Sequence, residues 1–286
     1  MKNLKIDYKK EDNNFIISAY LDNIVKGEMS VKELPWDTGL LGFKCIRITG
    51  IYFKENNFDY EIAKQMVSYL LASDIIGFNL IMFRFPSIQM KLGQNLESLG
   101  FYQVENLLTF KFTLSEPIRP AFDALSGVTI CLLNREDEKE INSVCEIAAN
   151  EFKYSRYHMD PHIPFDKAAN LKAQWTRNSC LGRATAVFVA RYNSNIVGFI
   201  LCNILTKCDS LISVIDLIGV DSRFANQGIG KALVGYLLTF SKEKGARYCL
   251  AGTQSHNLGS IRMYLKSGFM LDASELTFHY YKDNNQ

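Results

Sequence analysis

Apolar and polar positions alternate along the second half of the chain in a way that predicts strands first and helices later. Two apolar runs, residues 185–191 and 196–205, flank a polar turn at residues 192–195, which is the pattern of a β-hairpin. A third apolar run, residues 211–220, leads into a polar turn over residues 221–227. The first part of this region is therefore expected to be an antiparallel sheet.

Helical spacing begins directly after the second turn. Residues 228–244 carry apolar side chains three and four positions apart, at Ile229, Leu233, Tyr236, Leu237 and Phe240. A strand over residues 247–252, a helix over 257–266 and a long strand over 270–281 are expected to follow. Antiparallel strands that lead into strand–helix alternation predict a mixed α/β sheet.

The two halves of the chain share a sequence repeat. Gly-Phe at residues 100–101 is followed by Leu-Thr-Phe at residues 108–110, and Gly-Phe at residues 268–269 is followed by Leu-Thr-Phe at residues 276–278. Both parts of the second copy follow the first copy by the same 168 positions. Two matches in one register predict two related α/β units in tandem.

A linker separates the two units in the sequence pattern. Residues 115–127 hold two of the six prolines and end in Ser-Gly, between strand-like runs at residues 107–114 and 128–133. We therefore expect one domain over residues 1–114 and a second over residues 128–286.

A strand–turn–helix segment gives the strongest local signal for a ligand. Its turn contains Gly228 and Gly230, which let the backbone pass close to a bound group. The first turn of the following helix offers unpaired N–H groups and the positive end of the helix dipole, which suit a pyrophosphate. A simple tight turn also explains two glycines before a helix, so the pattern by itself leaves both interpretations open.

The combination of segments is more specific than the glycines. The turn resembles motif A of the Gcn5-related N-acetyltransferase (GNAT) superfamily, Gln/Arg-x-x-Gly-x-Gly/Ala, in which helix-start amides hold the pyrophosphate of CoA. Ala225 stands at the first position of that pattern, and Arg223 or Gln227 is available to compensate. The sequence TQSHN at residues 253–257, then Tyr264 and Gly-Phe, resembles motif B of the same superfamily, so the resemblance covers about residues 185–281.

The resemblance implies an acetyl-CoA or other acyl-CoA cosubstrate and a set of residues that bind it. By this likeness Asn257 binds the pantetheine arm, a role compatible with capping its own helix. Tyr264 stands near the thioester sulfur as a proton donor, and a core aromatic residue is the alternative. The cofactor-binding residues expected are Ile218, Val220, Gln227, Gly228, Ile229, Gly230, Lys231 and Asn257.

Two residues are candidates for a catalytic base that accepts a proton from the amine. Asp216 lies in an apolar strand and shares strand parity with Ile218 and Val220, so it is expected to face the acceptor. A charged side chain in an apolar strand needs a partner, so the alternative is that Asp216 pairs with a residue elsewhere in the fold. His158 is the second candidate, and a primary amine on a sugar can also react without a dedicated base.

Two further segments resemble the bacterial dTDP-fucosamine acetyltransferases and their relatives. These are residues 34–44, LPWDTGLLGFK, and residues 154–161, YSRYHMDP. Those enzymes acylate nucleotide-linked amino sugars and carry a truncated GNAT-like domain ahead of a complete catalytic one, which fits the repeat. An arginine fork suits a diphosphate, and aromatic faces suit a thymine or a sugar. The substrate-binding residues expected are Arg156, Tyr157, Trp36, Asp37 and Gln254; a core position for Trp36 and an exposed loop around Arg156 are the alternatives.

Composition bears on the classes of partner and on the cellular compartment that we expect for this protein. Of the 286 residues, 22% are charged and the net charge is only +2, so a nucleic-acid partner is not expected. No apolar run approaches the ~20 residues of a membrane span, and the N-terminus has no apolar signal segment. The seven cysteines form no CxxC pair, which indicates reduced thiols and a cytoplasmic protein, and the histidines have no metal-ligand set.

The sequence therefore favours an N-acyltransferase of a nucleotide-linked amino sugar, a reaction used in surface polysaccharide biosynthesis. The acyl group is acetyl or a short hydroxyacyl group such as 3-hydroxybutyryl. The alternatives are a GNAT enzyme for another small amine or a protein N-terminus, and a CoA-binding module without catalysis. The oligomeric state is open, with a homodimer as one outcome.

Overall fold

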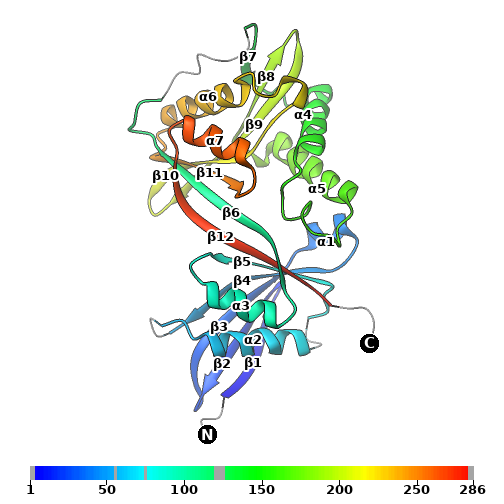
Figure 1. Cartoon of the computed structure of the whole chain (residues 1–286), viewed down its shortest axis with the longest axis vertical. Helices are drawn as coiled ribbons and strands as arrows, with labels where there is room; N and C mark the ends of the chain where they lie inside the picture. The colour runs from blue at the N-terminus through cyan, green and yellow to red at the C-terminus, as the bar shows by residue number, and fades with distance from the viewer. Residues whose placement is uncertain (1–3, 55–56, 74–75, 119–125, 283–286) are drawn as a thin grey trace. The chain divides into compact units, whose positions relative to one another are not determined.

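The computed structural model describes residues 4–54, 57–73, 76–118 and 126–282. The chain forms two compact α/β units (Figure 1). Unit 1 comprises Met1–Asn106 with Ser274–Gln286, and unit 2 comprises Leu107–Ala273.

Unit 1 is a mixed sheet covered on one face by two helices. The strand order in this unit is β1-β2-β3-β4-β5-β12-β6, in which β4 and β5 are parallel. Helices α2 and α3 pack their apolar faces onto the sheet because Met66 and Leu96 join the buried cluster around Phe83. The elements are β1 Leu4–Glu11, β2 Asn14–Leu21, β3 Ile24–Glu33, α1 Pro35–Leu41, β4 Cys45–Phe53, α2 Tyr60–Ala72, β5 Leu80–Pro86, α3 Met90–Ser98, β6 Tyr102–Thr113 and β12 Met270–Tyr281.

Unit 2 is a mixed sheet with helices on both faces, as Figure 1 shows. Its strand order is β6-β11-β10-β9-β8-β7. One buried cluster lies between the sheet and α6, and a second lies between the sheet and α4. The predicted hairpin, third strand and long helix are confirmed as β8, β9, β10 and α6. The elements are β7 Thr129–Leu132, α4 Glu138–Glu151, α5 Phe165–Asn178, the π-helical turn η1 Ser179–Arg183, β8 Ala186–Tyr192, β9 Asn195–Lys207, β10 Ser210–Val220, α6 Ile229–Glu243, β11 Tyr248–Gln254 and α7 Leu258–Lys266.

The predicted repeat is present in the fold at the same spacing. Helix α3 and strand β6 correspond to α7 and β12, and each boundary is displaced by 168 residues. The last strand of each repeat pairs with a strand of the other repeat. Thus β6 pairs with β11, with Thr113 opposite Tyr248, and β12 pairs with β5, with Tyr281 opposite Leu80.

This exchange of strands moves the unit boundaries away from the predicted domain boundaries. Residues 107–114 belong to unit 2 because they pair with β11, and residues 274–286 belong to unit 1, whose strand β5 pairs with β12. Local sequence signals do not report such long-range pairing. Within the predicted linker, 115–127, residues 119–125 lie outside the described part of the chain.

Unit 1 is a shortened version of unit 2. A two-residue turn, Asp12-Asn13, joins β1 to β2, whereas α4 and α5 separate β7 from β8. Unit 1 therefore has no helix pair at this point, which is the truncation expected of the first domain. Over the described residues, no helix is both long enough and apolar enough to cross a membrane.

Candidate active site

Strands β10 and β11 separate partway along β10. They pair in parallel only from Ser213 opposite Cys249 to Ile215 opposite Ala251. Strand β10 continues beyond this point to Val220 and stays paired with β9 on its other edge. Among the described residues, no strand pairs with the β11-facing edge of residues 217–220, so the end of β10 forms one side of a fork.

The direction of the backbone N–H groups in this fork follows from one hydrogen bond. The Asp221 N–H donates to the Val197 carbonyl on β9, with N···O 2.9 Å. Because N–H groups point alternately to the two edges of a strand, the N–H groups of Val220 and Ile218 point into the fork. This geometry suits the predicted roles of Ile218 and Val220 as backbone donors.

Helix α6 begins at the mouth of this fork with an uncapped first turn. Gly228, the N-cap, has φ 75°, a left-handed conformation that glycine adopts at little cost. No side chain among the described residues caps the helix, and its first turn has no acidic residue. The first internal bond runs from Ala232 N–H to the Gly228 carbonyl, so the N–H groups of Ile229 and Gly230 precede the internal ladder. Gln227 and Lys231 are half-buried beside them.

Close packing explains the second glycine of the turn. A Cβ at Gly230 would lie 2.8 Å from Met263 Sδ and 3.8 Å from the Val220 side chain. A side chain at this position would therefore disturb the contact between α6 and α7. The start of α6 is thus bare backbone, and its role as a pyrophosphate cradle stays a prediction.

The matching helix of unit 1 begins differently. Displacement by the repeat spacing places the start of α2 within one residue of the start of α6. There the Asp59 carboxylate accepts hydrogen bonds from the N–H groups of Glu61 and Ile62, both at 3.0 Å. An acidic side chain occupies the position that an anion would take, and Glu61 adds a second negative charge. Of these two matched helix starts, only that of α6 is open to an anion.

Asp216 lies where the fork begins, but on a different face from the one predicted. The pairing of β10 with β9 shifts between Ile215 and Leu217, so Asp216 is the extra residue of a β-bulge. Ile218 and Val220 pack in the cluster under α6, whereas Asp216 contacts Trp175 of α5. The predicted shared parity is wrong because the bulge interrupts the alternation.

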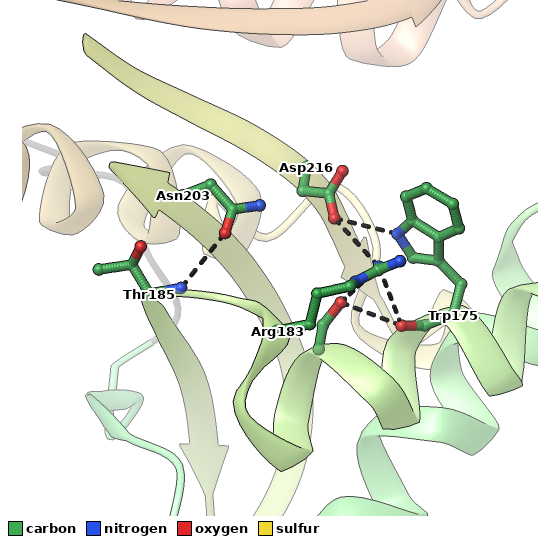
Figure 2. A network of polar contacts seen from close by, with 6 residues as sticks. Trp175, Arg183, Thr185, Asn203 and Asp216 are labelled. Atoms are coloured by element: carbon green, nitrogen blue, oxygen red, sulfur yellow. Dashed lines mark hydrogen bonds and ion pairs between the residues drawn. The ribbon is translucent and has the colours of Figure 1, made fainter. Parts of the chain in front are cut away.

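A polar network holds the Asp216 carboxylate (Figure 2). Its Oδ2 accepts from Trp175 Nε1 at 3.0 Å and lies 3.4 Å from Arg183 Nη2. The Arg183 guanidinium stacks 3.8 Å over the Trp175 ring. Asp216 therefore has the partners elsewhere in the fold that the sequence left open, and a role as base stays a prediction.

Tyr264 lies in the core of unit 2. Its side chain on α7 is 1% exposed and packs against Phe110 and Phe269. Burial raises the pKa of Tyr264, so the phenol keeps its proton at neutral pH. A proton donor and a core aromatic residue are both compatible with this position.

The end of β11 lies beside the loop between α4 and α5, next to Asn257. The Asn257 side chain caps α7 by accepting from the Ser260 N–H at 3.2 Å. His256 meets the Tyr154 ring edge-on, with centroids 5.3 Å apart. Gln254, the last residue of β11, is half-buried at the same end.

His158 is neutral in this loop. Burial, and then the positive charge of Lys172, lower the pKa of His158 to about 4. Its Nδ1 shares a 2.7 Å hydrogen bond with Ser155 Oγ, and its buried Nε2 has no hydrogen-bond partner among the described residues. Its predicted role as a base is untested.

The predicted acceptor residues fall into both units. In unit 2 the Arg156 guanidinium covers the buried Tyr157 ring at 4.4 Å and donates to Tyr157 Oη at 2.7 Å. Trp36 and Asp37 lie on α1 in unit 1, half-buried and buried respectively. A common site for all of them stays a prediction.

A groove in unit 2 runs beside the turn that precedes α6, with a volume of about 870 Å³. The sequence does not predict this groove because its walls come from four separate parts of the chain. Its lining residues are Ser143, Glu146, Ile147, Asn150, Glu151, Lys153, Phe165, Asn195, Ile196, Val197, Asp221, Ser222, Arg223 and Phe224.

A curated relative and two solved structures resemble this chain. The "Spore coat polysaccharide biosynthesis protein SpsD" of Bacillus subtilis (strain 168) is 34% identical over 140 residues, which is 49% of this chain and 47% of that protein. This chain thus spans about half the length of that relative. A GCN5-related N-acetyltransferase from Sphaerobacter thermophilus superimposes with TM-score 0.63 at 14% identity, over 96% of this chain and 82% of that one. A tandem GNAT protein from the clavulanic acid biosynthesis pathway does so with TM-score 0.61 at 8% identity, over 95% and 84%.

The two solved structures show the shared fold, and a match to a family profile shows which domain carries it. Residues 142–269 match the profile described as Acetyltransferase (GNAT) family. The match lies within unit 2 and runs from α4 through the fork and α6 to the end of α7. This chain therefore carries an acetyltransferase domain of the GNAT family.

Proposed function

We propose that this chain transfers an acyl group from acyl-CoA to the amino group of a dTDP-linked amino-dideoxy sugar of the fucosamine type. Acyl-CoA is the cosubstrate of the GNAT family to which the domain in unit 2 belongs. The single observation that carries the proposal is the uncapped start of α6 at the mouth of the β10–β11 fork.

The residues of this site fit the two chemical parts of CoA. The N–H groups of Ile229 and Gly230 and the positive end of the α6 dipole suit the pyrophosphate. The N–H groups of Ile218 and Val220 point into the fork and suit the amide-rich pantetheine arm. Asn257, at the start of α7, is available to the same arm. When bound, acyl-CoA supplies the activated acyl group.

A carbohydrate acceptor is supported from two sides. The relative from Bacillus subtilis is named for spore coat polysaccharide biosynthesis, and the segments around Trp36 and Arg156 resemble nucleotide-sugar acetyltransferases. The Arg156 guanidinium stacks on Tyr157, and a pair of this kind presents a planar cation that suits a diphosphate. The acyl group is acetyl or a short hydroxyacyl group such as 3-hydroxybutyryl.

A second candidate function keeps the chemistry and changes the acceptor to another small amine or a protein N-terminus. The Asp216 carboxylate favours it as much as the first, because aliphatic primary amines and protein N-termini are mostly positively charged at neutral pH. A non-catalytic CoA-binding module is the third candidate.

A thiol-release assay separates these functions. Acetyl-CoA and 3-hydroxybutyryl-CoA are each offered with a panel of dTDP-amino-dideoxy sugars, simple amines and a peptide N-terminus, and the product is identified by its mass. We expect release of CoA thiol with a dTDP-amino sugar. Turnover with the peptide or simple amines alone would overturn the sugar acceptor, and calorimetric binding of CoA without any turnover would favour the module.

We expect one CoA molecule to bind per chain. The cradle of α6 is open, whereas Asp59 fills the matching position of α2 with its own carboxylate. Calorimetric titration with CoA should therefore give a stoichiometry near one in the wild-type chain. A stoichiometry near two in the wild-type chain would contradict the closure of the unit 1 helix start.

A further inference from the structure

The Asp216 carboxylate sits at the point where the proposed reaction must take place. The last β10–β11 pair is Ile215 opposite Ala251, and Asp216 is the next residue of β10. If CoA lies in the fork, the amine must approach the same point from the face of the sheet that the fork leaves accessible. Asp216 is turned by the bulge toward α5, and its side chain is 22% exposed, so a ligand can reach it.

The two oxygens of this carboxylate differ. Oδ2 faces Trp175 Nε1 and Arg183 Nη2, whereas Oδ1 has no hydrogen bond or ion pair to any described residue. Figure 2 shows both dashed lines meeting at one oxygen and the other oxygen directed away from the network. A carboxylate accepts about four hydrogen bonds, so Asp216 keeps unused acceptor capacity on Oδ1.

The groups that hold Oδ2 are themselves held. Trp175 packs against the buried cluster between the sheet and α4, which restricts the direction of its indole N–H. The Arg183 guanidinium stacks on that indole, and its Nη2 also donates to Ser179 Oγ at 2.7 Å and to the Trp175 carbonyl at 3.2 Å. A guanidinium with these contacts has little freedom to follow the carboxylate, so the carboxylate is oriented by its surroundings.

We propose that Trp175 and Arg183 are positioning residues that hold Asp216 so that Oδ1 receives the ammonium group of the acceptor. The inference rests on the proposed function and names the chemistry that this point of the fork recognises: a primary amine in its charged form. Hydrogen bonds between an ammonium and a carboxylate are among the stronger ones in proteins. The role assigned to Asp216 is binding and orientation of the amine.

The kinetic test separates acceptor binding from the other steps. Trp175→Phe keeps an aromatic ring under Arg183 and removes the N–H donor, and Arg183→Gln removes the guanidinium. Each is expected to raise the acceptor KM about tenfold, the loss of one hydrogen bond to a charged group, while kcat falls less than about threefold and the acyl-CoA Kd is unchanged. The matched control is Arg177→Gln. Arg177 lies on α5, as Trp175 does, but it pairs with Glu138 of α4 and not with Asp216. It should leave all three constants unchanged.

A second measurement covers the case in which Trp175→Phe lowers the Tm. Asp216→Asn is tested with the acceptor and with its hydroxyl analogue, which carries no positive charge. We expect binding of the amine to weaken about tenfold or more and binding of the hydroxyl analogue, measured as an inhibition constant, to change less than about twofold. Equal weakening of both ligands, or an unchanged acceptor KM in Trp175→Phe and Arg183→Gln, would overturn the inference. A wild-type chain that acylates no amine would overturn the proposed function as well, so the two failures are distinguishable.

Discussion

Replacing Gly228 with valine is expected to lower the affinity for CoA at least about a hundredfold. Gly228 has φ 75°, and a β-branched residue is strained in this left-handed conformation. The helix start would either shift or carry a side chain where the backbone is proposed to meet the pyrophosphate. Both outcomes remove the alignment of the Ile229 and Gly230 N–H groups. Calorimetric titration with CoA measures the loss.

The glycine that follows the other end of α6 provides the control. Gly245, just after the C-terminal end of α6, has φ 79°, and a Cβ there would have no atom within 4 Å. Gly245→Val therefore carries a similar backbone strain far from the cradle, and it should lower the Tm without changing the CoA affinity. Equal CoA affinities in Gly228→Val and the wild-type chain would show that the start of α6 does not hold the coenzyme.

The glycine turn and the start of α6 could be predicted from the sequence because their signals are local. Gly228 and Gly230 lie within one turn, and the apolar spacing that follows them marks the helix. The mixed sheet of unit 2 is also confirmed, since each strand and helix shows its own period. The repeat was visible for the same reason, because residues 96–110 and 264–278 are continuous stretches whose similarity survives in α3 with β6 and α7 with β12.

The unit boundaries and the orientation of Asp216 could not be predicted because they depend on distant partners. Strand β12 pairs with β5 although Tyr281 and Leu80 are 201 positions apart in the sequence, and no local pattern records that choice. The bulge at Asp216 depends on the register between β9 and β10. Strict alternation places Asp216 with Ile218, and one extra residue moves it to the opposite face.

The network around Asp216 was missed for the same physical reason. Trp175 precedes Asp216 by 41 positions and Arg183 precedes it by 33. Trp175 lies in α5 and Arg183 in η1, and the sequence pattern predicted no elements for this stretch. An aspartate in an apolar strand signalled that a partner exists, but only the packing of α5 on the sheet identifies it.

Tyr264→Phe is expected to lower kcat about a hundredfold while the CoA affinity changes less than about threefold. The substitution removes one hydroxyl and keeps the ring that packs on Phe110 and Phe269. Burial raises the pKa of Tyr264, so the phenol keeps its proton throughout the pH range of an assay. If the hydroxyl protonates the departing thiolate, its loss slows that step. Measurement of kcat and of the calorimetric Kd for CoA gives the two numbers separately.

The same position also allows a purely structural role, and the comparison of three quantities separates the two. Tyr236, a tyrosine of α6 that is 44% exposed, provides the control, because Tyr236→Phe should leave kcat, Kd and Tm unchanged. If the Tyr264 hydroxyl only contributes to packing, kcat and the CoA affinity of Tyr264→Phe should fall together, along with the Tm. If the hydroxyl protonates the leaving thiolate, kcat alone should fall, since the buried ring and the cradle at Gly228 are unchanged. A loss confined to kcat would place the thioester sulfur within reach of the Tyr264 hydroxyl.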